Sequence, residues 1–261
     1  MEYVLIAAVC LVSSIIGALC GIGGGVVIKP VLDSLGLMSV STASFLSGLT
    51  VLSMSCYTIT LLFMKHEAAI KRSIALPLCA GAVVGGIAGK IMFNMVSAAM
   101  GGGNTIGAIQ AACLFVLVGG TLCYTFNKHR IHQLDVDNVA VELTVGLVLG
   151  LLSAFLGIGG GPFNLIALSF LFSMPTKVAA QNSLLIILCS QIASVVQTIA
   201  TSSVPEFSWV NLILMASMGV LGAVIGRSIN KKISDETVDK LFSGLNVVIM
   251  FICVYNFFRY L

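Results

Sequence analysis

The sequence predicts an all-α membrane protein that crosses the bilayer many times and is built from two repeats. Three observations support this class. Hydrophobic residues make up 58% of the chain and charged residues only 9%, compared with roughly 25% charged residues in soluble domains. Apolar runs long enough to cross about 30 Å of hydrocarbon recur along the whole length. The peptide Gly-Ile-Gly-Gly-Gly occurs at 21–25 and again at 157–161, each time after a long apolar run.

The remaining composition excludes several functional classes. The net charge of +3 is small and scattered, so we expect no nucleic-acid partner. The N-terminus lacks a basic region and a small-residue cleavage site, so the first apolar run is predicted to stay as a span. The eight cysteines lie inside apolar runs without C-x-x-C spacing, which is typical of small buried side chains. We expect neither a metal nor a cofactor.

An internal repeat relates the two halves. An offset of 136 residues places the first Gly-Ile-Gly-Gly-Gly on the second and Ser47 on Ser183. One further residue of slip places Lys90 on Arg227. Glycines at helical spacing allow membrane helices to pack closely, which is the simplest role for the stripes in the two halves. These stripes are Gly81, Gly85 and Gly89, and Gly222 and Gly226.

Each half contains five apolar segments. Their predicted ranges are 3–20, 25–37, 42–64, 73–95 and 106–126 in the first half, and 139–156, 162–174, 178–200, 208–227 and 240–258 in the second. The second segment of each half, of about 13 residues, covers only about 20 Å at 1.5 Å per residue. It is therefore either a short span or a re-entrant arm.

The basic loops favour a crossing. Basic residues cluster at 65–72, 128–130 and 227–232. All three clusters share one face of the membrane if the short segments cross, and the last two fall on opposite faces if they do not. The positive-inside rule therefore predicts ten spans with both termini outside. An odd number of spans in each half makes the repeats inverted, at 1–127 and 139–261, joined by a cytoplasmic linker at 128–138.

The two glycine-rich breaks predict an anion site. Glycine lets the backbone leave the helix and approach a ligand closely. Inside a bilayer, such a break survives only where protein or water satisfies the backbone. The short arms that follow begin with unpaired N–H groups and about half a positive charge each. The alternative is that the glycines only permit tight turns, but their duplication favours a site. The glycines assigned to it are Gly21, Gly23, Gly24, Gly25, Gly157, Gly159, Gly160 and Gly161.

The sequences around these breaks resemble the TauE/SafE family of sulfite exporter-like permeases. The resemblance is carried by 21–32 and 38–42 in the first half, and by 157–162 and 174–183 in the second, so it spans essentially the whole chain. It implies transport of sulfite, sulfonates or other small sulfur-containing or organic anions, with the loop glycines lining the substrate path. In the second arm Asn164 replaces an expected apolar residue, which indicates a substrate with more hydrogen-bonding groups than sulfite.

Polar residues inside the predicted spans are further candidates for substrate binding. Lys29 lies four residues past the first break, and ionisable groups in membranes default to a functional hypothesis. An i, i+4 pair with Asp33, or snorkelling to the interface, would explain it structurally. The other candidates are Ser47, Asn164, Gln181, Asn182 and Ser183.

These observations predict a secondary transporter of a small anion in the cell inner or plasma membrane. No nucleotide-binding or catalytic motif is present, so we expect no enzyme. A membrane potential of about −100 mV drives a monovalent anion outward by roughly 2.3 kcal/mol, which favours export. The alternatives are an anion channel, an importer of a small carboxylate or sulfur compound and, more distantly, a membrane sensor or scaffold. The sequence leaves the oligomeric state open.

Overall fold

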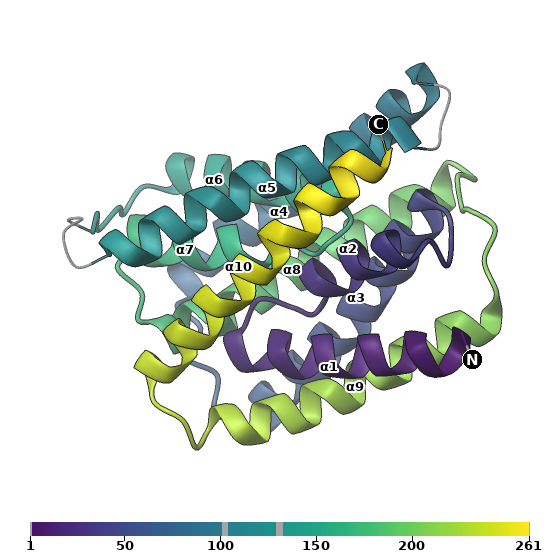
Figure 1. Cartoon of the computed structure of the whole chain (residues 1–261). Coiled ribbons are helices and arrows are strands. Elements are labelled where there is room, and N and C mark those ends of the chain that lie inside the picture. Colours follow the sequence, from purple (N-terminus) through teal and green to yellow (C-terminus); the bar gives the residue numbers. More distant parts are fainter. Residues whose placement is uncertain (1, 101–103, 129–132, 261) are drawn as a thin grey trace.

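Helices form all the regular secondary structure in the part of the chain that the computed structural model describes, which is residues 2–100, 104–128 and 133–260 (Figure 1). The first half contains α1 (Glu2–Cys20), α2 (Gly25–Leu35), α3 (Val40–Met64), α4 (Arg72–Ala99) and α5 (Asn104–Asn127). The second half contains α6 (Val139–Leu156), α7 (Gly161–Leu171), α8 (Thr176–Ala200), α9 (Trp209–Asn230) and α10 (Asp235–Tyr260). The predicted all-α class is confirmed.

The short helices α2 and α7 differ from the other eight. Those eight are long and apolar enough to cross a membrane, whereas α2 and α7 have 11 residues each. At 1.5 Å per residue, each short helix covers about 16 Å, or half of the hydrocarbon thickness. Helix α2 ends two residues before its predicted limit because Gly36 adopts the left-handed conformation, with φ of 65°. A full crossing by each short arm stays a prediction.

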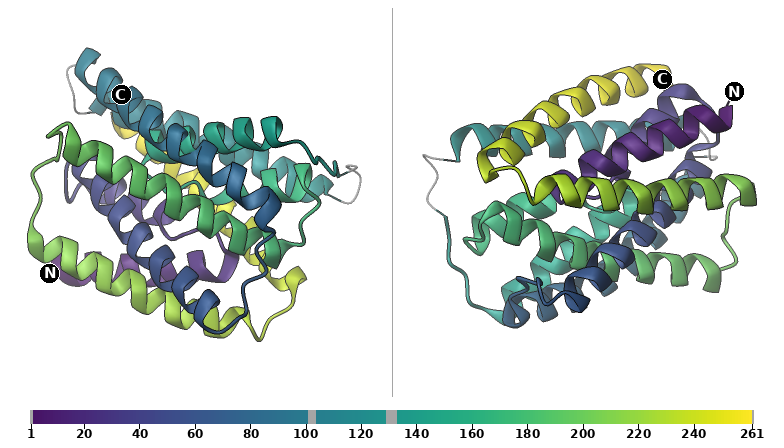
Figure 2. Two further views of the ribbon diagram at one scale, coloured as in Figure 1. Left: turned by 180° about the vertical axis from the view of Figure 1, so that it is seen from behind. Right: turned by 90° about the horizontal axis from the view of Figure 1, so that it is seen from below.

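One end of the bundle carries most of the ion pairs. Glu67, between α3 and α4, pairs with Arg227 and Lys231 at the end of α9. Lys128, after α5, pairs with Asp239 near the start of α10. These contacts bring the connections α3–α4, α5–α6 and α9–α10 to the same end (Figure 2). We call it the basic end.

The opposite end holds the remaining connections. Thr42, early in α3, donates a hydrogen bond of 3.0 Å to the carbonyl of Glu206 in the α8–α9 connection. Asn94, late in α4, donates one of 3.2 Å to the hydroxyl of Ser203. Helix α1 begins and α10 ends at this same end (Figure 1). Of the predicted linker at 128–138, residues 129–132, including Arg130, lie outside the described residues.

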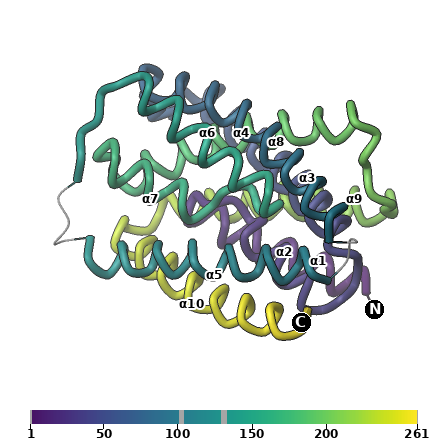
Figure 3. Tube along the Cα trace, turned by 90° about the horizontal axis from the view of Figure 1, so that it is seen from above, coloured from purple at the N-terminus to yellow at the C-terminus, as the bar shows by residue number. Residues whose placement is uncertain are grey.

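Glycine stripes set the closest helix contacts. Helix α4 packs along α6, α9 packs along α1, and α5 runs beside α10 (Figure 3). A methyl group added to Gly85 would collide with the carbonyl of Leu147, and one added to Gly222 would lie 2.9 Å from the carbonyl of Leu11. The repeat offset relates both the two glycines and the two leucines, so the same contact is made twice.

Replacing Gly85 with leucine should destabilise the protein, because its side chain has to displace the backbone of α6. Overpacking of this kind costs typically about 1–3 kcal/mol, so the thermal midpoint in detergent should fall. Gly120→Leu is the matched control, since nothing lies within 4 Å of a methyl group placed there. Equal losses in both variants would contradict close packing at Gly85.

Candidate functional site

The two glycine-rich breaks lie against each other inside the bundle. A methyl group on Gly25 would collide with the carbonyl of Ile158, and one on Gly161 would lie 2.8 Å from the carbonyl of Ile22. The offset of 136 residues exchanges these two contacts. Because each break excludes a side chain facing the other, the start of α2 and the start of α7 meet at one central crossing, which we call the crossing.

Left-handed backbone explains why glycine occupies the first position of each break. Gly21 has φ of 70° and Gly157 has φ of 66°, a region that other residues rarely adopt. The short helices then begin at Gly24 and Gly160 without any side-chain hydrogen bond to their first N–H groups. Helix N-termini without such caps are suited to binding an anion.

A cavity of about 300 Å³ leads from the basic end to Gly21. We call it the vestibule. Its wall includes Thr58 and Ala180, and its mouth carries one carboxylate among three bases. Glu67 accepts from Arg227 at 2.7 Å and from Lys231 at 2.6 Å, which holds the pKa of its carboxyl below the ordinary value. The other base is Lys177. The excess of bases makes the vestibule attractive to anions.

A second cavity lies at Gly157 and is almost closed, with a volume of about 20 Å³. We call it the closed cavity. It is related to the vestibule by the repeat, because Ser44 replaces Ala180, Ser194 replaces Thr58, and Gly157 replaces Gly21. The two cavities therefore approach equivalent glycines of the two breaks. One is open and the other is shut.

Gln181 and Asn182 connect α8 to the α3–α4 connection. Gln181 lines the vestibule, where its side-chain oxygen accepts from the backbone N–H of Ala69 at 2.8 Å. Asn182 is fully buried and donates to the carbonyls of Ala69 and Val178, while its own side-chain oxygen has no partner. Gln181 thus faces the vestibule, and Asn182 holds the loop beside it.

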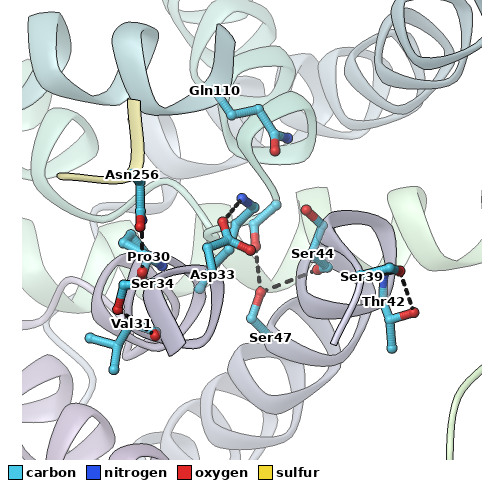
Figure 4. A network of polar contacts seen from close by, with 12 residues as sticks. Pro30, Val31, Asp33, Ser34, Ser39, Thr42, Ser44, Ser47, Gln110 and Asn256 are labelled. Carbon is cyan, nitrogen blue, oxygen red and sulfur yellow. Dashed lines mark hydrogen bonds and ion pairs between the residues drawn. The ribbon is translucent and has the colours of Figure 1, made fainter. Parts of the chain in front are cut away.

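Ser47 and Ser183 occupy equivalent places with different contacts. The hydroxyl of Ser47 donates to the carbonyl of Gly157 at 2.7 Å (Figure 4). The hydroxyl of Ser183 is buried without a partner. Asn164, one turn into α7, is fully buried, and neither its side-chain oxygen nor its nitrogen has a partner. Ser183 and Asn164 therefore have unused hydrogen-bonding capacity inside the bundle.

Lys29 forms the predicted pair with Asp33. Its Nζ lies 2.5 Å from the carboxylate, and both side chains are buried. The pair borders a cavity of about 10 Å³ between α2, α5 and α10, where Gln110 and Asn256 also lie (Figure 4). Neither residue lines the vestibule or the closed cavity. The structure therefore places Lys29 apart from the other charged candidates.

Sequence reasoning overlooked two bases as site residues. Lys90 lines the closed cavity and Arg227 lines the vestibule. The repeat already aligned these residues, and Lys90 lies well inside an apolar run, so a signal for both was present. The expectation that the spans contain almost no positive charge besides Lys29 is wrong, since Lys90 is 94% buried in α4. Glu67 was also missed because its partners are distant in sequence.

The fold and the two cavities define a multi-pass membrane protein with a polar path interrupted near its centre. The chain belongs to the TauE/SafE family, because the family model described as "Sulfite exporter TauE/SafE" matches residues 5–252. It is 25% identical over 261 residues to the "Probable membrane transporter protein YunE" of Bacillus subtilis (strain 168), covering 91% of this chain and 92% of that protein. No solved structure matches. The protein is a membrane transporter.

Glu67→Gln should remove a pH-dependent part of the protein's stability. Because the folded-state pKa of Glu67 is lowered, its two ion pairs stabilise the protein above the unfolded-state pKa and are lost as the pH falls through the lowered value. The thermal midpoints of wild type and Glu67→Gln should therefore converge in acid. Glu236→Gln, at an exposed position of α10, is the control. A difference that does not change with pH would contradict the ion-pair account.

Proposed function

We propose that this protein is a secondary permease that exposes a small-anion site alternately to the two faces of the membrane. The observation that carries the proposal is the pair of repeat-related cavities at Gly21 and Gly157, of about 300 and about 20 Å³. A transporter with one site and two gates requires one path to be open while the other is shut. The vestibule is the open path and the closed cavity is the shut one.

The charges at the cavities favour an anion. Lys177, Arg227 and Lys231 surround the vestibule with Glu67 as the one carboxylate, and Lys90 lines the closed cavity. Field lines from such bases raise the local concentration of anions at the mouth. The two helix N-termini at the crossing add partial positive charge without a side chain. A cation would meet unfavourable charge at each of these steps.

We place the substrate at the crossing. The glycines of both breaks would line it, with backbone N–H groups from α2 and α7 as donors. The buried and unpartnered side chains of Asn164 and Ser183 support this placement, because buried polar groups are normally hydrogen-bonded. Gln181 would meet the substrate on its way through the vestibule. Ser47 and Asn182 would hold the surrounding backbone, and Lys29 would stabilise α2 through Asp33.

Reciprocal contacts support two inverted repeats, in which each half can adopt the conformation of the other. Gly21 lies against Ala180 just as Gly157 lies against Ser44, and the offset of 136 residues exchanges the two pairs. The closest approaches of α4 to α6 and of α9 to α1 are exchanged in the same way. Inverted repeats provide alternating access by exchanging the conformations of the halves.

The positive-inside rule assigns the basic end to the cytoplasm. The vestibule then opens inward and the closed cavity lies on the outer side. Because the membrane potential drives anions outward, export needs no coupled ion. We propose export of sulfite, a sulfonate or a related small oxyanion. The closed cavity favours a carrier over a channel, since a channel needs both cavities open together.

Flux in proteoliposomes tests this function directly. Vesicles loaded with sulfite should lose it faster than protein-free vesicles, and external sulfite should accelerate the exit of labelled internal sulfite, because a carrier returns faster when loaded. Parallel assays with 2-hydroxyethanesulfonate and acetate would define the class of anion, with methylammonium as the cationic control. Flux of methylammonium alone would refute an anion site. Flux without acceleration by external anion would indicate a channel.

A further inference from the structure

The strongest unexplained feature is a buried cation without a carboxylate. Lys90 is only 6% exposed, and its Nζ lies 4.8 Å from the centre of the Phe93 ring. A single aromatic face compensates only part of the cost of desolvating an ammonium group. Over residues 2–100, 104–128 and 133–260, Lys90 has no ion pair or hydrogen bond to another side chain. The bases that do have ion pairs are Lys29, Lys128, Lys177, Arg227 and Lys231.

The repeat shows what Lys90 lacks. Its equivalent in the second half is Arg227, which pairs with Glu67. The position equivalent to Glu67 is Ser203, which accepts a hydrogen bond from Asn94 instead. The basic end therefore supplies its own counter-ion to the buried base. The opposite end retains the polar contact without the negative charge.

The closed cavity beside Lys90 is lined with hydrogen-bond donors. The hydroxyl of Ser44 is buried there and has no partner. Thr198 stands where the vestibule has Leu62, and Ser44 stands where it has Ala180. The lining of the closed cavity contains no carboxylate. Hydroxyl groups therefore gather at the one buried base that has no counter-ion.

We propose that Lys90 and Ser44 bind the transported anion in the closed cavity, as its station next to the opposite face. This inference deepens the proposed function and rests on it. The anion would supply the charge that Ser203 does not, and the free hydroxyl of Ser44 would donate to it. Gln191 and Ser194 line the same cavity. Several donors around one cation suit a small oxyanion with several acceptor oxygens, such as sulfite or a sulfonate head group.

The geometry of the site also couples binding to opening. A volume of about 20 Å³ holds a water molecule but no sulfite. Lys90 also lines a larger cavity of about 380 Å³ that reaches Ser41, Asn94 and Ser203. It therefore stands between the closed cavity and the opposite end. An anion on Lys90 would bind best when the path widens there, so binding and opening would favour each other.

Lys90→Met and Lys90→Arg, compared by thermal shift and by sulfite binding to the purified protein, test this proposal. Lys90→Met should raise the midpoint of the anion-free protein, because it removes an unpaired buried charge, and should weaken sulfite binding by about tenfold or more. Lys90→Arg should keep most of the affinity. Lys240→Met is the control for the loss of one exposed positive charge. Ser44→Ala, which keeps Lys90, should weaken binding less.

The outcomes separate this proposal from the function on which it rests. If wild type neither binds nor transports sulfite, 2-hydroxyethanesulfonate or acetate, the anion permease is wrong and so is the station at Lys90. If wild type binds sulfite and Lys90→Met binds it equally well, only the station is wrong. A purely structural role predicts a lower midpoint for Lys90→Met with unchanged affinity. Stabilisation by chloride as strong as that by sulfite would overturn the oxyanion assignment.

Discussion

The constraint on which the structure depends is the need to satisfy backbone groups released by two helix breaks within a membrane. Unpaired carbonyls in hydrocarbon each cost several kcal/mol, by a rough measure. Asn230 of α9 donates to the carbonyl of Leu19, and Gln110 of α5 donates to that of Phe155, at 2.6 Å. The repeat relates these two carbonyls. Side chains from distant helices thus tie each break into the centre of the bundle.

Fixing both breaks in this way leaves two approaches to the crossing. The vestibule and the closed cavity have equivalent walls but different charges, since Glu67 pairs with Arg227 on one side and no carboxylate pairs with Lys90 on the other. A protein with equal cavities on both sides would have no preferred state. The charge difference between the halves gives each gate its own chemistry, so the two faces of the membrane present different sites to the same anion.

Much of the fold follows from local sequence. All ten predicted segments match helices, because hydropathy over about 20 residues reports burial in lipid directly. The Lys29–Asp33 pair follows from spacing along one helix. The contacts of Glu67 with Arg227, and of Gln181 with Ala69, join residues more than 100 positions apart, so no local pattern contains them. The lack of a carboxylate beside Lys90 depends on every neighbouring helix and emerges only from packing.

Accessibility of the two cavities to a membrane-impermeant thiol reagent tests alternating access most directly. Cysteine would replace Thr58 in the vestibule and its equivalent Ser194 in the closed cavity, one at a time, in a background without other cysteines. Without substrate, position 58 should react quickly from the basic end and position 194 slowly from the opposite end. Saturating sulfite should slow the first reaction and accelerate the second. Acceleration of both together, or no effect on either, would contradict alternating access.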